Sequence, residues 1–163
     1  ADDAIEAVRH RLMMLADVVT PNVPEAAVLL NTAPARSADE LAAQAEELAA
    51  AGVRAALVKG GHLTDEQLTD VFASSRGAVR LTSPRITSRN THGTGCTLSS
   101  ALAACAARRG DTHESGVSLE AVREARDYLW HAIESGAKWR LSRTPDTGHG
   151  PVNHQVWLGE LRS

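Results

Sequence analysis

The stretch "RNTHGTGCTLSSALAACA", residues 89–106, carries the most specific structural signal in the chain. A polar run bends through Gly93 and Gly95, reaches Cys96, and continues at once as a predicted helix of small residues. The apolar positions of this helix fall on one stripe: Leu98, Ala101, Leu102, Cys105 and Ala106. The fold must therefore hold a glycine turn at the entrance of a buried helix.

The chemistry of this turn follows from the free amides at a helix start. The first N–H groups of a helix have no internal acceptor, and the helix dipole adds partial positive charge there. Glycine lets the backbone present these groups to a ligand oxygen, and a thiolate at Cys96 is stabilised in the same place. We interpret residues 93–96, the anion turn, as a candidate phosphate or oxyanion cradle, with Cys96 as base or nucleophile. The alternative is a structural glycine turn with Cys96 as a small apolar filler.

The two cysteines have different expected roles. If both lie on this helix, Cys96 and Cys105 are separated by roughly 13 Å along its axis and lie on opposite faces. That distance excludes a disulfide, so both are expected to be free thiols in a reducing compartment. Cys105 belongs to the apolar stripe and is predicted to be a core residue.

The first third of the chain predicts alternating helices and strands. Residues 4–16 have apolar side chains at near-helical spacing, and residues 17–20 are typical of a short buried strand. A second helix follows with Pro24 in its first turn. The inward side chains of the first helix are predicted to be Ile5, Val8, Leu12 and Leu15.

A third helix and a strand complete an α/β pattern. Ser37 and Glu40 predict a capping box, and Gly52 predicts the end of the helix. The strand over residues 53–59 comes next, so the order strand, helix, strand predicts a parallel sheet with crossovers. The inward face of the helix is predicted to carry Leu41, Ala45, Leu48 and Ala49.

The remaining segments are predicted in less detail. Residues 60–81 form a loop or a pair of strands, and extended structure over residues 78–86 is interrupted at Pro84. A long helix over residues 118–141 is predicted, and the tail forms an ordered loop that leads to a terminal strand. The inward side chains of the long helix are predicted to be Leu119, Val122, Leu129 and Ile133.

Composition excludes several classes of protein. The 163 residues suit one domain, and the hydrophobic fraction of 43% is that of a globular protein. The net charge of -3 argues against a general nucleic-acid binder. No apolar run approaches the roughly 18 residues of a membrane span, so we expect no membrane partner and a cytoplasmic location.

Two further motifs point to phosphate chemistry. "TPNVPE" places Asn22 and Glu25 at a helix start, where a carboxylate can hold magnesium beside phosphate oxygens. "LVKGGH" places Lys59 at the carboxyl end of a strand, where open α/β sheets bind ligands. Each motif alone is more often ordinary helix-entry or turn chemistry.

Together these motifs resemble one family. "TPNVPE", "LVKGGHL", "NTHGTGCTLS" and "GHGPVNH" occur in the order found in hydroxymethylpyrimidine/phosphomethylpyrimidine kinases of the ribokinase-like superfamily, over nearly the whole chain. The last two motifs are the more specific. The superfamily generally has aspartate at the end of the anion turn, so Cys96 indicates the pyrimidine-kinase branch or the similar pyridoxal kinases.

The resemblance implies an activity and a base. The enzyme would transfer the γ-phosphate of ATP to 4-amino-5-hydroxymethyl-2-methylpyrimidine, and then phosphorylate the monophosphate to the pyrophosphate used in thiamine synthesis. Cys96 would be the base facing the substrate hydroxyl. The implied anion hole consists of the amides of Gly93, Thr94, Gly95 and Cys96.

The same resemblance implies the cofactors and their ligands. Glu25 with Asn22 matches the family's magnesium element, and Lys59 matches its phosphate-proximal lysine. Lys59 and Thr94 would bind the phosphates of the nucleotide. ATP and Mg²⁺ are therefore the expected cofactors.

The resemblance also implies a fold that is only partly present. A three-layer α/β/α arrangement with a mainly parallel central sheet is expected, in which residues 1–163 form the C-terminal nucleotide-binding part of a single domain. The N-terminal part of the family's fold, with much of the acceptor pocket, is expected to be missing. We therefore expect the chain alone to lack a complete pocket and to self-associate, most simply as a homodimer, to cover its open sheet edge.

Alternatives stay open at this point. The acceptor could be pyridoxal or pyridoxine, or the chain could be a non-catalytic module stabilised by self-association. A zinc site could draw on His92, Cys96, His149 and His154, and an acyl-transfer enzyme could use Cys96 as nucleophile. The Asn22–Glu25 and Lys59 motifs favour the kinase. No role follows for His149 and His154, and no adenine contacts are assigned.

Overall fold

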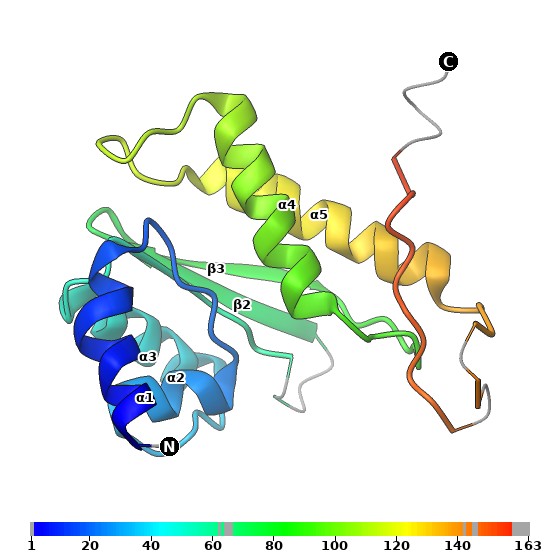
Figure 1. Ribbon diagram of the computed structural model, residues 1–163, viewed down its shortest axis with the longest axis horizontal. Helices are drawn as coiled ribbons and strands as arrows, with labels where there is room; N and C mark the ends of the chain where they lie inside the picture. The colour runs from blue at the N-terminus through cyan, green and yellow to red at the C-terminus, as the bar shows by residue number, and fades with distance from the viewer. Residues whose placement is uncertain (1, 62, 64–66, 142, 145–146, 158–163) are drawn as a thin grey trace. The chain divides into compact units, whose positions relative to one another are not determined.

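The computed structural model describes residues 2–61, 63, 67–141, 143–144 and 147–157. The chain divides into two compact units (Figure 1). The first unit comprises Ala1–Arg85 and Thr112–Val117, and the second comprises Ile86–Asp111 and Ser118–Ser163. The assignment of residues 1–163 to one domain stays a prediction.

The first unit begins with the predicted helical run. It consists of α1 (Asp2–Ala7), the π-helical η1 (Val8–Leu12) and the 3₁₀ turn η2 (Met13–Leu15). The predicted inward face is wrong, because Leu12 and Leu15 are 60% and 76% exposed whereas Met13 is buried. The π and 3₁₀ turns depart from the α-helical repeat, which shifts the buried face away from the predicted spacing.

Two capped helices follow: α2 (Val23–Leu30) and α3 (Ala38–Ala50). Pro24 lies in the first turn of α2, and Gly52, at φ +97°, follows α3, both as predicted. Ser37 Oγ accepts a hydrogen bond from the Glu40 N–H at 3.2 Å. The predicted return bond is absent, because Glu40 Oε2 accepts from the Arg36 N–H at 2.7 Å instead. The capping box at Ser37 is therefore only half formed.

Within the described residues, the sheet of the first unit has three strands in sequence order: β1 (Ala55–Val58), β2 (Gln67–Ser74) and β3 (Gly77–Pro84). β1 and β3 fall on predicted extended segments, and β2 with β3 forms the predicted pair of strands. Both pairings are antiparallel, with Leu57 opposite Phe72 and Ser74 opposite Gly77. Gly77 has φ +103°, which suits glycine at the exit of a tight hairpin turn.

Parallel pairing is confined, in the part of the chain that the structure describes, to isolated bridges. Residues 17–20 form no strand, and Val19 makes a single parallel bridge to Ala56. The Leu57 N–H donates to the Val19 carbonyl at 2.8 Å, so this segment does run parallel to β1. The α/β class is confirmed, but the three named strands are joined antiparallel rather than mainly parallel. A short connection such as the turn between β2 and β3 permits only antiparallel pairing.

The core of the first unit lies between α3 and the sheet (Figure 1). Leu41, Ala45 and Leu48 of α3 are fully buried in one cluster with Val58 and Val71. Burial of each large aliphatic side chain contributes about 1.5–3 kcal/mol. This cluster fixes β1, which ends one residue before Lys59.

The second unit is built on two helices that pack against each other: α4 (Thr94–Arg109) and α5 (Leu119–Gly136) (Figure 1). The predicted stripe of α4 is confirmed, since Leu98, Leu102 and Cys105 are buried and Ala101 and Ala106 are half-buried. The helix that follows the anion turn is therefore anchored along its length.

Helix α5 begins after Ser118 as predicted but ends at Gly136 rather than at Leu141. Val122 is fully buried, and the other predicted inward residues are half-buried: Leu119, Leu129 and Ile133. The carbonyl of Gly136 accepts a hydrogen bond from Asn90 Nδ2 at 2.8 Å. This tertiary contact at the helix end has no local sequence signal, which explains the wrong boundary.

The tail is an ordered segment rather than a strand over residues 147–157. Pro151 makes an isolated parallel bridge to His92, and Val152 is buried. The rest of the predicted terminal strand lies outside the described residues. Among the helices that the structure describes, none combines the length and the apolar character needed to cross a membrane.

Candidate functional site

The segments before α2 and after β1 meet in the first unit. Asn22 makes a parallel bridge to Lys59, and the Lys59 N–H donates to the Pro21 carbonyl at 2.9 Å. These contacts fix the start of α2 beside the carboxyl end of β1. The structure therefore brings together three of the predicted site residues: Asn22, Glu25 and Lys59.

Glu25 serves as a helix cap and lies beside a cation. Its Oε2 accepts from the Asn22 N–H at 2.7 Å, and Asn22 Oδ1 accepts from the Glu25 N–H at 2.9 Å. Lys59 Nζ lies 4.0 Å from the same Oε2. The side chain of Lys59 is 22% exposed and that of Glu25 is 58% exposed. Glu25 therefore does complete the capping box of α2, and its carboxylate still faces solvent.

Asn22 and Glu25 fit a magnesium ion whose other ligands are water and substrate phosphates. No group of three or more His, Cys, Asp or Glu side chains that could hold a metal occurs among the described residues. Mg²⁺ commonly keeps several waters and binds through one or two carboxylates and substrate phosphates. The exposed carboxylate of Glu25 suits that mode, and a closed protein cage does not.

The sequence did not reveal two residues that hold the turn after Lys59, namely Asp70 and Arg85. Asp70, in β2, is 5% exposed, and its Oδ1 accepts from the Gly60 N–H at 2.9 Å. A Cβ on Gly60 would lie 1.8 Å from the carbonyl oxygen of Thr69. Only glycine permits this approach, which explains the first glycine of "KGG". The signal that could have revealed Asp70 is a lone carboxylate inside an apolar strand.

Arg85 holds the turn after Lys59 from the other end of the hairpin. Its Nη1 donates to the Gly61 carbonyl at 3.2 Å, and its Nη2 donates to the Leu63 carbonyl at 2.7 Å. A guanidinium can bind two carbonyls at once because its donors form a rigid fork. The turn that carries Lys59 is therefore fixed from both β2 and the residue after β3.

The anion turn lies in the second unit, at the start of α4. Gly93 caps the helix at φ +80° and ψ 6°, a left-handed conformation that favours glycine. The Thr97 N–H and Oγ1 both donate to the Gly93 carbonyl at 2.8 Å, and the Thr94 N–H donates weakly to the Thr91 carbonyl at 3.3 Å.

The N–H groups of the next two residues of α4 have no hydrogen-bond acceptor in the described part of the protein. No side chain caps α4, and within the described residues the N–H groups of Gly95 and Cys96 donate to no protein atom. Such groups carry the partial positive charge of the helix start. The arrangement can receive the oxygens of an anion.

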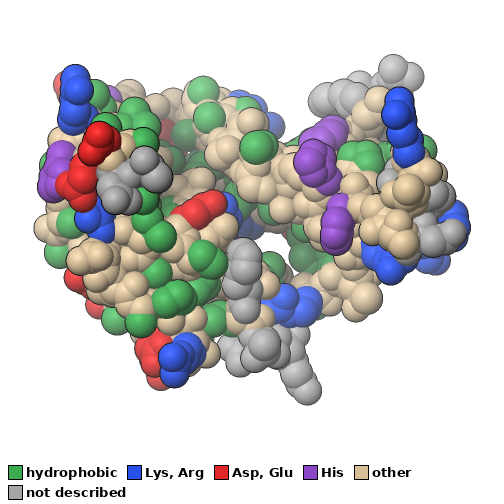
Figure 2. Space-filling model, turned by 60° about the horizontal axis from the view of Figure 1, so that its bottom comes forward, with side chains coloured by type: hydrophobic (Ala, Val, Ile, Leu, Met, Phe, Trp, Pro, Cys, Tyr) green, Lys and Arg blue, Asp and Glu red, His purple; other side chains and the backbone are tan. Residues whose placement is uncertain are grey.

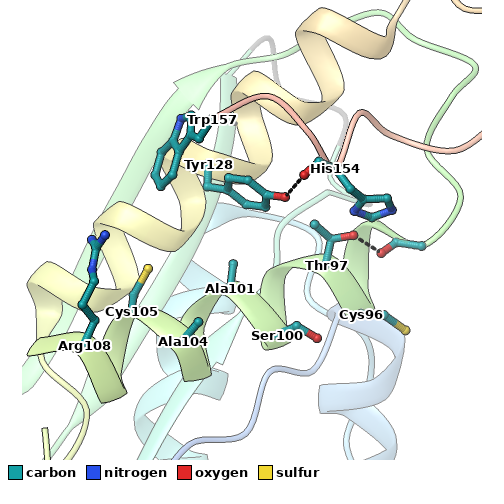
Figure 3. Close-up of a pocket in the computed structure, with 11 residues that line it drawn as sticks. Cys96, Thr97, Ser100, Ala101, Ala104, Cys105, Arg108, Tyr128, His154 and Trp157 are labelled. Carbon is teal, nitrogen blue, oxygen red and sulfur yellow. Dashed lines mark hydrogen bonds between the residues drawn. The ribbon is translucent and has the colours of Figure 1, made fainter. Parts of the chain in front are cut away.

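The two cysteines of α4 have opposite surroundings. Cys96 is exposed and Cys105 is buried, and both are free thiols. Burial raises the pKa of the Cys105 thiol, and the charges of Arg108 and Arg109 oppose this rise. Figure 3 shows Cys96 at the helix start, pointing away from Tyr128. The thiol available for chemistry is therefore Cys96, next to the amides of the anion turn.

An open groove of about 560 Å³ runs along α4 in the second unit (Figure 3). Gly93 and Cys96 lie at one end, and Cys105 and Arg108 lie further along α4. The opposite side is set by Tyr128, whose OH donates to the His154 carbonyl at 2.8 Å and whose ring lies 5.0 Å from that of Trp157. The anion turn thus opens onto a surface large enough for a small molecule.

The motifs "NTHGTGC" and "GHGPVNH" meet in the second unit. The His92 N–H donates to the Gly150 carbonyl at 3.1 Å, and His92 bridges Pro151. His149 and His154 are exposed, and Figure 2 colours purple the histidine side chains that reach the face it shows. The backbone that enters the anion turn is therefore held by the tail segment.

The predicted site residues therefore form two groups. Asn22, Glu25 and Lys59 belong to the first unit, and residues 93–96 belong to the second. Within each group the side chains and amides lie together.

Comparison with known proteins gives close relatives. The hydroxymethylpyrimidine/phosphomethylpyrimidine kinase of Rhizobium meliloti is 44% identical to this chain over 153 residues, and that of Escherichia coli is 42% identical over 153 residues. Each match covers 93% of this chain and 53% of the relative. The chain thus spans about half the length of the curated relatives that it matches.

Solved structures give the same fold. The pyridoxal kinase of Bacillus subtilis, in an ADP complex, superposes with a TM-score of 0.81 at 29% identity, covering 96% of this chain and 54% of that chain. This likeness confirms the predicted ribokinase-like fold class. A family model described as phosphomethylpyrimidine kinase matches residues 1–153. The chain therefore belongs to the phosphomethylpyrimidine kinase family.

Proposed function

We propose that this chain carries the phosphate-transfer residues of an ATP-dependent kinase of thiamine biosynthesis. The substrates are 4-amino-5-hydroxymethyl-2-methylpyrimidine and its monophosphate, and the final product is the pyrophosphate. The observation that carries the proposal is the pair of acceptor-free amides at Gly95 and Cys96, beside an exposed thiol, in a chain of this family.

The anion turn accounts for most of the catalysis in this proposal. Phosphoryl transfer requires mainly positioning and stabilisation of charge on the transferred group. The amides of Gly93, Gly95 and Cys96 receive its oxygens, whereas that of Thr94 donates to the Thr91 carbonyl. Cys96, as thiolate, accepts the proton of the acceptor hydroxyl while that oxygen bonds to the γ-phosphorus. The bond from the γ-phosphorus to the bridging oxygen breaks, and ADP leaves.

The first unit supplies the charge for the phosphate chain. Lys59 extends from the end of β1 and places an ammonium beside phosphate oxygens, and Thr94 of the second unit adds a further phosphate contact. Asn22 and Glu25 would hold Mg²⁺, which neutralises phosphate charge when bound. The 4.0 Å approach of Lys59 Nζ to Glu25 Oε2 supports this pairing, because the two groups can serve the same charged ligand.

Pyridoxal is the second candidate acceptor. The TM-score of 0.81 to a pyridoxal kinase supports it. The identity of 42% and more to pyrimidine kinases, against 29% to that pyridoxal kinase, favours the pyrimidine. Competition between the two acceptors for phosphate from labelled ATP distinguishes them, and preferential labelling of pyridoxal would contradict the main proposal.

We also keep a homodimer and a cytoplasmic location as proposals. The exposed hydrophobic side chains of η1 and η2 support association, since Leu12 and Leu15 would otherwise stay in water. Two free thiols support a reducing compartment. The native mass of the assembly tests the dimer. A monomer would contradict it, and a dimer that binds no ATP would favour the non-catalytic module.

The test of the activity uses the protein expressed from its own gene. A bacterium that lacks its own phosphomethylpyrimidine kinase requires thiamine, and this protein is expected to restore growth without it. Cys96→Ala is expected to lower kcat of the purified protein by about 10²-fold or more, the contribution of a positioned base. Its affinity for ATP should stay nearly unchanged, because the amides remain. A stably expressed wild-type protein that fails to restore growth would contradict the proposal.

A further inference from the structure

Asn90 is a buried polar side chain at a junction of three segments in the second unit. It is 5% exposed. Its Nδ2 donates to the carbonyls of Gly136 and Trp139, both at 2.8 Å, and lies 3.4 Å from that of Ala137. The last carbonyls of a helix have no internal donor, so Asn90 satisfies the end of α5 with one amide group. The side chain thereby ties the segment before α4 to the end of α5.

The tail segment closes the other side of this junction. A Cβ on Gly150 would lie 2.1 Å from Asn90 Oδ1 and 2.9 Å from Asn90 Cγ. The side chain of Asn90 therefore occupies the space that any larger residue at 150 would need. This contact gives a physical reason for the second glycine of "GHGPVNH", which the proposed function leaves unexplained.

The junction lies directly next to the anion turn. Two residues after Asn90, the His92 N–H donates to the Gly150 carbonyl at 3.1 Å, and Gly93 then caps α4. The contacts made by Asn90 and His92 fix the backbone that enters the turn. The direction of the Gly95 and Cys96 amides depends on that backbone, because no side chain caps α4.

We infer that Asn90 is a positioning residue, which clamps the anion turn to the end of α5 and to the segment around Gly150. It touches no reacting atom. Its importance for phosphate transfer rests on the proposed function, whereas the clamp itself can be tested without nucleotide.

The reactivity of Cys96 reports the clamp. Cys96 lies beside the amides of the helix start, and its side chain is already exposed, so access does not limit its reaction. Loosening of the turn is expected to slow alkylation by iodoacetamide roughly two- to fivefold, the range of a helix-dipole contribution. No Lys or Arg lies between the two cysteines, so fragment-ion sequencing of the peptide that holds both assigns the label to Cys96 or to the buried Cys105.

Three variants of the chain make this test. Asn90→Asp keeps the shape of the side chain and removes its donors, and Asn90→Ala removes both. Alkylation is measured well below the melting temperature of each variant, and both variants are expected to react more slowly than the wild type. Asn153→Ala is the matched control, since Asn153 binds Ser135 Oγ and the Gln155 N–H in the same tail. A merely structural role would lower the melting temperature of the Asn90 variants with the Cys96 rate unchanged, and that result would overturn the inference.

Gly150→Ala tests the same clamp from the other side, and it keeps the inference falsifiable if the Asn90 variants do not fold. The new methyl group must displace Asn90, so alkylation of Cys96 is expected to slow in the single variant. In the Asn90→Ala background the same substitution should have little further effect, because the clash is gone. Gly150→Ala with a wild-type rate, or with the same added effect in both backgrounds, would overturn the inference.

Kinetics then separate the two proposals. In the active protein, Asn90→Asp is expected to lower kcat roughly 10- to 100-fold, as expected for a small misplacement, with the KM for the acceptor nearly unchanged. If Cys96 alkylation slows but the wild-type protein has no kinase activity, the clamp stands and the proposed function fails. If kinase activity is present and Asn90→Asp leaves both kcat and alkylation unchanged, the clamp fails and the proposed function stands.

Discussion

At the scale of single residues, the two cysteines of α4 illustrate how position decides chemistry. Cys96 lies at the helix start, exposed beside amides that have no protein acceptor, whereas Cys105 lies two and a half turns later in the packed stripe. The same side chain is thus available for proton transfer in one place and kept neutral in the other. Because Cys105 is a titratable group in the core, its protonation affects the stability of the fold.

Stability is expected to fall at alkaline pH through Cys105. Burial raises the pKa of this thiol in the folded state, so the folded protein holds its proton more tightly than the unfolded chain. The stabilisation is therefore complete below the unfolded pKa of about 8.5 and is lost as the pH rises through the folded pKa.

The measurement is urea unfolding from pH 7 upward for the wild type and for Cys105→Ala. Groups other than Cys105 titrate in both proteins, so only the difference in their free energies of unfolding reports this thiol. That difference is expected to shrink as the pH rises. Parallel curves at all pH values would contradict the prediction.

Glu25 offers a separation of capping from metal binding. Gln at the same position can still complete a capping box, so Glu25→Gln should change the free energy of unfolding by no more than about 0.5 kcal/mol. If the carboxylate supports Mg²⁺, the Mg²⁺ concentration for half-maximal activity should rise about tenfold.

The matched control is Glu40→Gln. Glu40 also lies in the first turn of a helix and accepts a main-chain N–H, from Arg36, but it belongs to α3. Its magnesium titration is expected to match that of the wild type. An unchanged titration for Glu25→Gln as well would remove Glu25 from the metal site.

At the scale of elements, the turn after β1 is shaped by close backbone packing. Gly60→Ala would place a methyl group 1.8 Å from the Thr69 carbonyl oxygen. Because β2 must shift to relieve this clash, the free energy of unfolding should fall by about 1–3 kcal/mol or more.

The neighbouring glycine of the same motif is the control for that substitution. Among the residues that the structure describes, a Cβ on Gly61 would meet only the far end of the Leu68 side chain, at 3.9 Å. Gly61→Ala should therefore stay within about 0.5 kcal/mol of the wild type in urea unfolding. Equal losses for the two variants would show that the clash does not determine the effect.

The elements also show what a sequence alone can predict. Helix starts with local signals were predicted correctly at Ser118 and around Pro24, because caps and first-turn preferences lie within a few residues. The stripe of α4 was also predicted correctly, because the helical spacing of its apolar residues is a local pattern.

Features set by distant segments were not predicted. The end of α5 depends on Asn90, which lies 46 residues before Gly136 in the sequence. Asp70 was missed because one of its partners, the Gly60 N–H, lies ten residues away in the sequence. The site motifs could be found individually, but the contacts that hold them come from tertiary packing.

At the scale of the whole molecule, the proposed reaction draws on residues of both units. Lys59 and Glu25 belong to the first, and the anion turn belongs to the second. In the proposed function one nucleotide is bound by residues of both units, so its binding would stabilise the folded chain by mass action and would respond to substitutions in either unit. Nucleotide binding therefore gives a test of the molecule as one functional whole.

We expect ATP with Mg²⁺ to protect Cys96 from alkylation, since its phosphates occupy the anion turn. Lys59→Ala removes a charge from the first unit, yet it should raise the ATP concentration needed for half-maximal protection by about tenfold, the loss of a charged contact of 1.5–3 kcal/mol in part offset by Mg²⁺. The measurement is the rate of Cys96 alkylation against ATP concentration. Arg76→Ala, at the exposed β2–β3 turn, serves as control and should match the wild type. If Lys59→Ala left the protection curve unchanged, Lys59 would not contact the nucleotide that the anion turn binds, and the two groups would have to serve separate ligands.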